Sequence, residues 1–333
     1  MKNQVYDKIL AGNAYLNKIK NSTIMITGAT GTVGFAVAEF LAYCNDNYDA
    51  GIKLVCPVRN PARLAVGLRE RRDVNAVKYD LAADVDFDFE VDYVIHCAGP
   101  TRSKFMVENP VDTIDAIYGG TKKLLEYFKY KGKKGFLYVS SVEVYGENFD
   151  ADKSFTEDTL GAVDQLNVRS SYPEAKRLAE TLCTAYSSQY NLPVKIARLT
   201  QIIGAGQDDN RLIAYLCDCA KNKNQIVLKS DGKATKAYCP IDDCVSALIC
   251  ILVNGENTAY NVANKDMEYS VRELAEFVAD KYIGKKVVIE NQESAIYPKS
   301  SYLVMDSAKL CDLGWTPVIG LREAFDSLIT ERA

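Results

Sequence analysis

The sequence predicts an α/β fold in which a doubly wound parallel sheet carries a smaller C-terminal α/β lobe. Up to about residue 200, short apolar runs rich in Val, Ile and Tyr alternate with longer amphipathic stretches, which is typical of βαβ units. The length of 333 residues suits one large α/β domain or a large domain with a smaller lobe, because single cores stop growing at roughly 250–300 residues. We expect residues 1–200 to form the sheet domain and 201–333 the lobe, with part of 237–262 returning to the sheet domain.

In chain order, the apolar runs predict strands at Thr23–Thr27, Ile52–Val58, Ala76–Tyr79, Tyr93–Cys97, Phe136–Ser140 and Lys195–Leu199. The amphipathic stretches between them predict helices at Val33–Tyr43, Val111–Lys129 and Tyr172–Gln189. Beyond residue 200 the pattern predicts short strands at Ile226–Leu228, Ala237–Ile241 and Val287–Ile289, and helices at Leu212–Ala220, Val271–Lys281 and Leu321–Ile329. The lobe should close over the carboxyl edge of the sheet.

The composition excludes several classes of function. Forty Lys and Arg against 44 Asp and Glu give a net charge of −4, so no basic surface indicates a nucleic-acid or anionic-lipid partner. The single histidine, His96, and ten cysteines without C-x-x-C spacing predict no metal site and favour the reduced thiols of a cytoplasmic protein. We expect no signal peptide and no membrane span, because the apolar run Cys244–Val253 is too short.

A glycine-rich turn directly follows the first predicted strand. The segment reads Thr27-Gly28-Ala29-Thr30-Gly31-Thr32-Val33-Gly34 and runs into an apolar helix. Glycines let the backbone approach a pyrophosphate closely, and the start of the helix offers N–H groups and the positive end of its dipole. In this strand–turn–helix context the spacing predicts a Rossmann-type dinucleotide site, formed by Gly28, Thr30, Gly31, Thr32, Val33 and Gly34.

The end of the second predicted strand favours NADP over NAD without excluding NAD. No Asp or Glu occurs between Ala50 and Arg69, where NAD enzymes place an acid for the ribose hydroxyls. Instead Arg59 ends the strand and Arg63 follows, and both suit a phosphate; the alternative is that both are solvated surface residues. Asp80, after the third strand, can accept the adenine amino group or serve as a turn residue.

The pattern Y-x-x-x-K occurs five times, but only the copy at Tyr172 opens a long amphipathic helix after a strand that ends in hydroxyls. One helical turn places Lys176 beside Tyr172. We expect its charge, together with an oxidised nicotinamide, to pull the phenol below its usual pKa of about 10, so that Tyr172 acts as a base. Ser141, at the carboxyl edge of the sheet, should hold and orient the same substrate hydroxyl.

Together these motifs resemble the extended short-chain dehydrogenase/reductases that act on nucleotide sugars, the NAD-dependent epimerase/dehydratase family. The resemblance covers nearly the whole chain. It rests on the glycine turn, His96-Cys97-Ala98-Gly99, Ser140–Gly146, Tyr172-x-x-x-Lys176, Arg198, Asp242-Asp243, Tyr260-Asn261-Val262 and Leu313-Gly314-Trp315-x-Pro317. It implies a tightly bound NADP or NAD contacted also by Ala98 and Lys176, a nucleotide-diphosphate sugar substrate, and a homodimer formed through Val111–Lys129 and Tyr172–Gln189.

The resemblance further implies that the Tyr/Lys/Ser set oxidises C4 of the sugar, and that the 4-keto intermediate makes the C5 proton acidic. Glu143 stands where UDP-glucuronate decarboxylases and dehydratases place a glutamate that moves a proton at C5 or C6, whereas simple 4-epimerases carry a small residue there. Val142 replaces the acid of dTDP-glucose dehydratases. Lys233-Ala234-Thr235-Lys236 replaces an arginine of the decarboxylases, which keeps the charge but loses the bidentate fork.

The same resemblance implies the substrate residues, namely Thr101, Arg102, Gln201, Arg211 and Lys236. Thr101 and Arg102 follow the fourth strand where relatives line the sugar pocket, and Gln201 replaces an asparagine after the sixth. Arg211 and Lys236 would face the diphosphate; the alternative is that each is a surface charge. His96 should lie buried at the cofactor edge without a catalytic role.

Two rival interpretations stay open. An arginine after the second strand is also typical of NADPH-dependent carbonyl reductases of the dihydroflavonol-reductase type, which consume their cofactor rather than retain it. A noncatalytic NADP-sensing protein on the same fold is the other rival. It would not need Ser141, Tyr172 and Lys176 together, and this chain carries all three.

Overall fold

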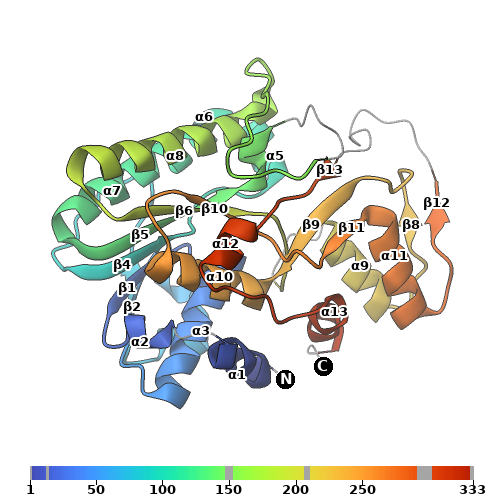
Figure 1. The fold of residues 1–333 in the computed structure, drawn as a ribbon, viewed down its shortest axis with the longest axis horizontal. Helices are drawn as coiled ribbons and strands as arrows, with labels where there is room; N and C mark the ends of the chain where they lie inside the picture. The colour runs from blue at the N-terminus through green and yellow to red at the C-terminus, as the bar shows by residue number, and fades with distance from the viewer. Residues whose placement is uncertain (1, 13–14, 147–152, 206–210, 291–301, 331–333) are drawn as a thin grey trace.

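The computed structural model describes residues 2–12, 15–146, 153–205, 211–290 and 302–330. Its centre is a seven-stranded parallel sheet with the order β3-β2-β1-β4-β5-β6-β10 (Figure 1). The strands are β1 (Thr23–Thr27), β2 (Lys53–Val58), β3 (Val74–Lys78), β4 (Val91–His96), β5 (Gly132–Ser141), β6 (Val194–Leu199) and β10 (Ala259–Val262). Because the strand order reverses direction at β1, the carboxyl ends of β1 and β4 flank the crevice where such sheets bind ligands.

Helices cover both faces of this sheet (Figure 1). One face carries α3 (Thr32–Tyr48) and α10 (Ile241–Asn254), with α1 (Lys2–Gly12) and α2 (Leu16–Ile19) beside them; the other carries α6 (Pro110–Ile114), α7 (Gly120–Lys131) and α8 (Ser171–Tyr190). Successive residues of β1 alternate between the two layers: Ile24 and Ile26 join the core under α3, and Met25 joins the core under α7 and α8. Both faces of the strand are buried, which explains its continuous apolar run.

The smaller lobe is built around β9 (Thr235–Pro240), which pairs with β7 (Gln201–Ile203), β11 (Glu268–Ser270) and β13 (Tyr302–Leu303). A second strand pair joins β8 (Val227–Leu228) to β12 (Val288–Ile289). Its helices are α9 (Leu212–Lys221), α11 (Val271–Val278) and α13 (Leu321–Thr330). After β9 the chain leaves the lobe, because α10 packs on α3 and β10 pairs with β6 at the edge of the central sheet.

The predicted fold class is confirmed, and the predicted strands and helices lie within a few residues of the observed ones. One difference is that the helix expected at Val111–Lys129 consists of α6, a π-helical turn η2 (Asp115–Gly119) and α7. Its two glycines, Gly119 and Gly120, favour a helical irregularity, and Gly120 packs against the Leu81 side chain. In the described ranges, no helix is both long enough and apolar enough to cross a membrane.

The C-terminal segment is fastened to α10 by two buried contacts. Trp315, which is 1% exposed, donates from Nε1 to Ser246 Oγ at 2.8 Å. The Asp243 carboxylate is fully buried and accepts the backbone N–H groups of Val318 at 2.9 Å and Ile319 at 3.2 Å. Burial raises the pKa of Asp243 to about 7, although both N–H bonds lower it.

The raised pKa of Asp243 predicts a pH dependence of stability. The folded state binds a proton that the unfolded carboxyl releases near its usual pKa, so this contribution to the free energy of unfolding is present at acid pH and is lost as the pH rises toward 7. Between about pH 5 and pH 8, the wild type should lose about 2 kcal/mol relative to the Asp243→Asn variant in urea unfolding. A difference between the two proteins that does not change with pH would contradict this.

Candidate active site

The glycine turn joins the carboxyl end of β1 to the start of α3, in the middle of the sheet edge. Gly28 has a φ of +73°, and a Cβ there would stand 2.9 Å from the backbone nitrogen of Ala98. A Cβ on Gly34 would overlap the carbonyl oxygen of Gly28. Only glycine therefore permits this close turn, and the N-terminal end of α3 faces out of it, so the turn fits a pyrophosphate.

The arginines predicted to select NADP lie beside this turn. β2 pairs with β1 in parallel, so both strands end at the same edge of the sheet. Arg59 follows β2, Arg63 ends the 3₁₀ turn η1 (Pro61–Arg63), and both side chains are exposed. Asp80 is also exposed, and its carboxylate accepts the N–H of Ala82 at 3.0 Å. Asp80 is thus a turn residue, and its contact with adenine stays a prediction.

His96 is buried at the carboxyl end of β4 and forms a chain of hydrogen bonds. Thr121 Oγ1 donates to the Ile117 carbonyl at 2.5 Å, so it accepts from His96 Nε2 at 3.1 Å. Thr27 Oγ1 accepts the N–H of Ala98 at 3.2 Å, and its own proton points to His96 Nδ1 at 2.7 Å. Because each hydroxyl has one proton to donate, the imidazole carries its proton on Nε2 and ties β4 to β1 and α7.

The four predicted catalytic residues come together at the carboxyl end of β5. Ser141 ends the strand, and its Oγ accepts the N–H of Glu143 at 3.2 Å, which caps the 3₁₀ turn η3 (Val142–Tyr145). Tyr172 lies in the first turn of α8, buried, and its side chain is hydrogen-bonded to Ser141. Lys176 Nζ lies 5.9 Å from the centre of the Tyr172 ring and donates to the carbonyl of Val139 at 2.8 Å.

The charges around Tyr172 act in opposite directions on its phenol. The pKa of Tyr172 is raised to about 12, first by burial and next by the Glu143 carboxylate. The hydrogen bond to Ser141 and the charges of Arg169 and Arg211 lower it. The expectation that Lys176, together with an oxidised nicotinamide, lowers the pKa of this phenol stays a prediction. Burial lowers the pKa of Lys176 itself to about 8.

Arg169 is a residue of this site that the sequence did not indicate. It lies in the 3₁₀ turn η4 (Val168–Ser170), directly before α8. Its Nη2 stands 2.9 Å from each carboxylate oxygen of Glu143, and its guanidinium carbon lies 5.5 Å from the centre of the Tyr172 ring. The only available signal was its position three residues before Tyr172, in a polar stretch that is otherwise typical of a surface loop.

Two of the predicted substrate residues meet across the mouth of the site. Arg211 stands at the start of α9, and its Nη2 donates to the Thr101 carbonyl at 3.0 Å. Arg102 is exposed at the start of the short helix α5 (Ser103–Glu108). The first residues of the lobe thereby approach the loop that follows β4.

The other two predicted substrate residues lie on paired strands of the lobe. Gln201 begins β7 opposite Tyr238 of β9, and Lys236 lies two residues earlier on β9. Burial lowers the pKa of Lys236, and the Glu143 carboxylate raises it, which places the two charges within electrostatic reach. Lys236 and Arg211 are thus the two lobe residues whose charges act on members of the predicted catalytic set, Glu143 and Tyr172.

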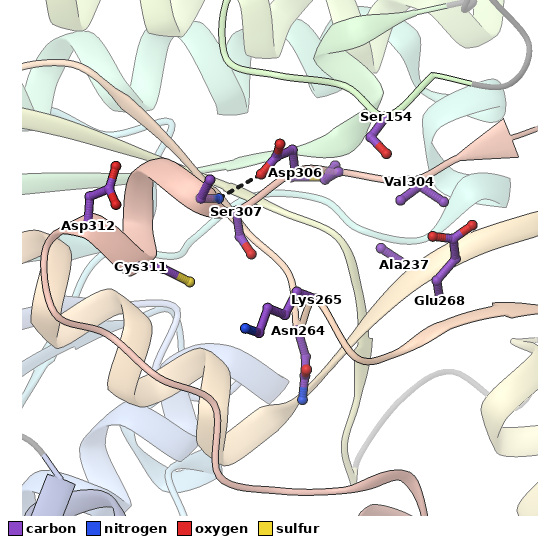
Figure 2. A pocket seen from close by; sticks show the side chains of 12 residues that line it. Ser154, Ala237, Asn264, Lys265, Glu268, Val304, Asp306, Ser307, Cys311 and Asp312 are labelled. Atoms are coloured by element: carbon purple, nitrogen blue, oxygen red, sulfur yellow. Dashed lines mark hydrogen bonds between the residues drawn. The ribbon is translucent and has the colours of Figure 1, made fainter.

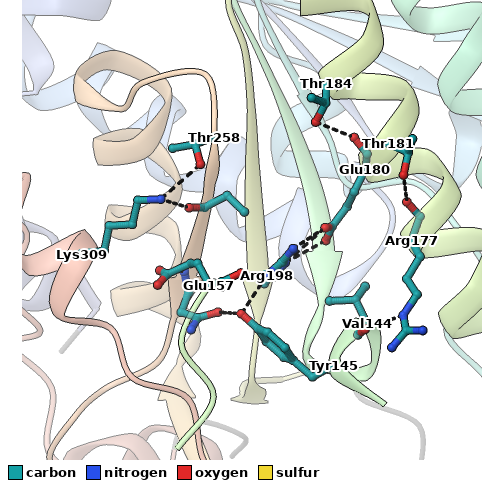
Figure 3. A network of polar contacts seen from close by, with 12 residues as sticks. Val144, Tyr145, Glu157, Arg177, Glu180, Thr181, Thr184, Arg198, Thr258 and Lys309 are labelled. Atoms are coloured by element: carbon teal, nitrogen blue, oxygen red, sulfur yellow. Dashed lines mark hydrogen bonds and ion pairs between the residues drawn. The ribbon is translucent and has the colours of Figure 1, made fainter. Parts of the chain in front are cut away.

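A buried polar network connects the elements that carry the site (Figure 3). Arg198 of β6 pairs with Glu180 of α8 at 2.7 Å, and its Nη1 donates to the hydroxyl of Tyr145 at 3.0 Å and to the carbonyl of Glu157 at 2.9 Å. The Tyr145 hydroxyl in turn donates to Asn261 Oδ1 at 2.6 Å. The network joins η3, α8, β6 and β10, and therefore fixes the elements that carry Glu143 and Lys176.

A cavity of about 360 Å³ opens in the lobe beside β9 and the segment that leads into α12 (Ala308–Asp312) (Figure 2). Its polar lining includes Lys265, Glu268, Asp306 and Ser307. None of the predicted site residues lines it. Over the ranges that the structure covers, no group of His, Cys, Asp or Glu side chains could hold a metal ion, and all ten cysteines are free.

The buried position of His96 predicts an unusual titration. Burial, followed by the charge of Lys176, lowers the pKa of His96 to about 3. Because the chain has one histidine, its imidazole ¹H–¹³C signal can be followed by NMR without ambiguity. We expect this signal to stay constant between about pH 5 and pH 8, the range in which an exposed histidine titrates. A midpoint near the ordinary value would contradict the buried hydrogen-bond chain.

Comparisons with curated proteins match the chain over most of its length. It is 28% identical to UDP-glucuronic acid decarboxylase 1 of Arabidopsis thaliana over 322 residues, which is 94% of this chain and 70% of that protein. It is 29% identical to UDP-glucuronic acid decarboxylase 6 of the same plant over 313 residues, or 91% of this chain and 86% of that protein.

Solved structures match the fold. RMD of Pseudomonas aeruginosa, complexed with NADPH, is 26% identical, with a TM-score of 0.74 over 93% of this chain and 98% of that one. UDP-glucuronic acid 4-epimerase of Bacillus cereus, in complex with UDP-glucuronic acid and NAD, is 20% identical, with a TM-score of 0.75 over 93% of this chain and 100% of that one. The model of the NAD dependent epimerase/dehydratase family matches residues 24–263. The chain is therefore an enzyme of the NAD dependent epimerase/dehydratase family.

Proposed function

We propose that this enzyme converts a nucleotide-diphosphate sugar by transient oxidation at C4, followed by a proton transfer that involves Glu143. The observation that carries this proposal is the convergence of Ser141, Glu143, Tyr172 and Lys176 at the carboxyl end of β5. That end of the sheet also carries the glycine turn, two strands away in the order β5-β4-β1. A hydroxyl-bearing substrate held there would lie between a proton acceptor and a dinucleotide.

The cofactor would be held by Gly28, Thr30, Gly31, Thr32, Val33 and Gly34 at its pyrophosphate, and by Ala98 and Lys176 near its nicotinamide end. When bound, it would supply a hydride acceptor for the oxidation at C4. Arg59 and Arg63, exposed beside the turn, favour NADP. Tight retention is part of the proposal, because a hydride that returns to the same sugar requires that the cofactor does not leave.

Each residue has a separate task. Ser141 donates to the C4 oxygen of the sugar and orients it, and Tyr172 takes the proton of the C4 hydroxyl. Lys176, buried and positively charged beside the ring, stabilises the phenolate. Glu143, half-exposed on η3, faces the sugar and moves a proton at C5 or C6 once the C4 ketone has made that proton acidic.

The substrate would span both parts of the chain. Arg211 and Lys236 supply positive charge for the diphosphate, and Thr101, Arg102 and Gln201 would line the sugar. The names of the curated relatives favour a decarboxylase acting on UDP-glucuronate, and the glutamate at position 143 is consistent with one. Val142 argues against a dehydratase of the dTDP-glucose type, since it removes the acid expected there.

We also propose a cytoplasmic homodimer. α6 packs against both α5 and α8 on the outer face of the sheet (Figure 1). Their exposed apolar side chains include Val107, Val111, Ile114 and Leu178. A second copy of the chain would cover this apolar surface. The cytoplasmic location rests on the ten free cysteines.

The direct test is incubation with UDP-, dTDP-, GDP- and CDP-sugars, read by mass spectrometry. We expect loss of carbon dioxide from UDP-glucuronate with no added cofactor; loss of water or an unchanged mass would instead identify a dehydratase or an epimerase. Tyr172→Phe should lower turnover at least 100-fold, because general base catalysis contributes about that much. Tyr130→Phe is the matched control, since Tyr130 has the same Y-x-x-x-K spacing but is 70% exposed.

If Tyr172→Phe left the turnover of every active sugar unchanged, the mechanism would be wrong. Protein that is purified without nucleotide and consumes NADPH stoichiometrically with a carbonyl substrate would support the reductase alternative. Absence of turnover with every sugar and carbonyl, together with NADP binding, would support the sensing protein.

Cofactor preference is tested by the double variant Arg59→Gln/Arg63→Gln. Loss of two charge-assisted contacts to a phosphate should weaken NADP binding at least tenfold and leave NAD binding nearly unchanged, as measured by calorimetry. Arg72→Gln is the control. Arg72 is also exposed, but it precedes β3 and so lies at the amino-terminal ends of the parallel strands, whereas the glycine turn lies at their carboxyl ends. Equal weakening of NAD and NADP would show that the two arginines do not meet the extra phosphate.

A further inference from the structure

Arg169 contacts two reactive groups at once. Its Nη2 lies 2.9 Å from both carboxylate oxygens of Glu143, so one nitrogen holds the whole carboxylate. The guanidinium carbon lies 5.5 Å from the centre of the Tyr172 ring, within the range of a cation–π contact. Arg169 thus lies between the proposed base and the proposed proton carrier.

Local hydrogen bonds in the loop before α8 position Arg169. The Asn167 side chain accepts the N–H of Arg169 at 2.9 Å and caps η4. Asp164 accepts the N–H of Leu166 through its carboxylate at 3.0 Å, and its carbonyl accepts the Ser170 hydroxyl at 2.5 Å. These local hydrogen bonds fix the backbone on both sides of Arg169. The Arg169 side chain therefore extends to Glu143 from a backbone that is held in place.

The charges that face Tyr172 come from four elements. Glu143 on η3 is the negative one; Arg169 on η4, Arg211 at the start of α9 and Lys176 on α8 are positive. Lys236 on β9 interacts with the charge of Glu143. Of the two arginines that lower the pKa of Tyr172, only Arg169 also pairs with Glu143. Arg211 instead donates to the Thr101 carbonyl.

We propose that Arg169 is a positioning residue that holds the Glu143 carboxylate and the Tyr172 phenol as one linked pair. This inference rests on the proposed function, because it assigns a role within the same proton transfers. When Glu143 takes up a proton, its attraction for Arg169 weakens, and the full guanidinium charge becomes available to a phenolate at Tyr172. A proton gained at one group therefore makes the other easier to deprotonate, which suits a reaction in which the two groups act in turn.

The linkage is measured by a double-mutant cycle. The readout is the pH dependence of single-turnover nicotinamide reduction, whose acid limb reports the Tyr172 base. Arg169→Gln should move this limb to higher pH and Glu143→Gln to lower pH. Arg169→Gln should shift the acid limb less in the wild-type background than in the Glu143→Gln background. In the wild-type background, loss of the arginine also releases the Glu143 carboxylate, whose negative charge opposes the effect of the arginine on the phenol. Both side chains are partly exposed, at 31% and 39%, so the variants should fold.

Arg211→Gln is the matched control, since Arg211 acts on Tyr172 by charge without holding Glu143; its shift should be equal in both backgrounds. Arg169→Lys should keep the pH dependence near that of the wild type but lower overall turnover about tenfold, because an ammonium on a shorter side chain keeps the charge without placing the carboxylate. Equal Arg169→Gln shifts in the two backgrounds would overturn the linkage.

The same cycle can be read without a substrate. In protein made with 3-fluorotyrosine, whose phenol is more acidic, the ¹⁹F signal missing from Tyr172→Phe reports the titration of this one ring. If no nucleotide sugar reduces the nicotinamide, the proposed function fails, and the ¹⁹F cycle still decides the linkage. Shifts that depend on the Glu143 background support it, and additive shifts overturn it.

Discussion

The buried ion pair between Glu180 and Arg198 is the interaction on which the rest of the site depends. It joins α8 to β6 at 2.7 Å, with side chains that are 10% and 15% exposed. Removing either partner would leave a charge with little water around it, which costs several kcal/mol. Arg198 also donates to Tyr145, whose ring stacks on Phe155 at a centroid distance of 4.6 Å. Arg198 therefore connects α8, which carries Tyr172, to η3, which carries Glu143.

The pair also explains how a lysine can stay charged in the interior. Lys176 is one helical turn before Glu180, and this carboxylate raises the pKa of the lysine against the lowering caused by burial. The carbonyl of Val139 accepts a further bond from its ammonium group. The support of a Tyr172 phenolate that we propose for Lys176 would thus depend on Glu180 as well. The network ends at Asn261 of β10, which also binds the carbonyls of Phe155 and Asp306, so late segments of the chain take part.

Local sequence was sufficient to predict the central sheet, because buried parallel strands are short apolar runs and the glycine turn marks where the first one ends. It also predicted that, of the five Y-x-x-x-K matches, the copy at Tyr172 opens a long helix, which is α8. It could not indicate Arg169, whose role comes from the tertiary approach of η4 to η3. The same holds for the pairing of Arg211 with the Thr101 carbonyl.

The central claim is that a hydride leaves C4 of a sugar and returns to the same molecule. A nucleotide sugar that carries deuterium at C4 tests this directly, when the product is analysed by mass spectrometry and NMR after turnover without added cofactor. The account predicts that the deuterium stays within the sugar product and that no free nicotinamide is consumed. Deuterium that is lost to the solvent, or that is recovered on nicotinamide cofactor released from the protein, would contradict the return of the hydride to the sugar.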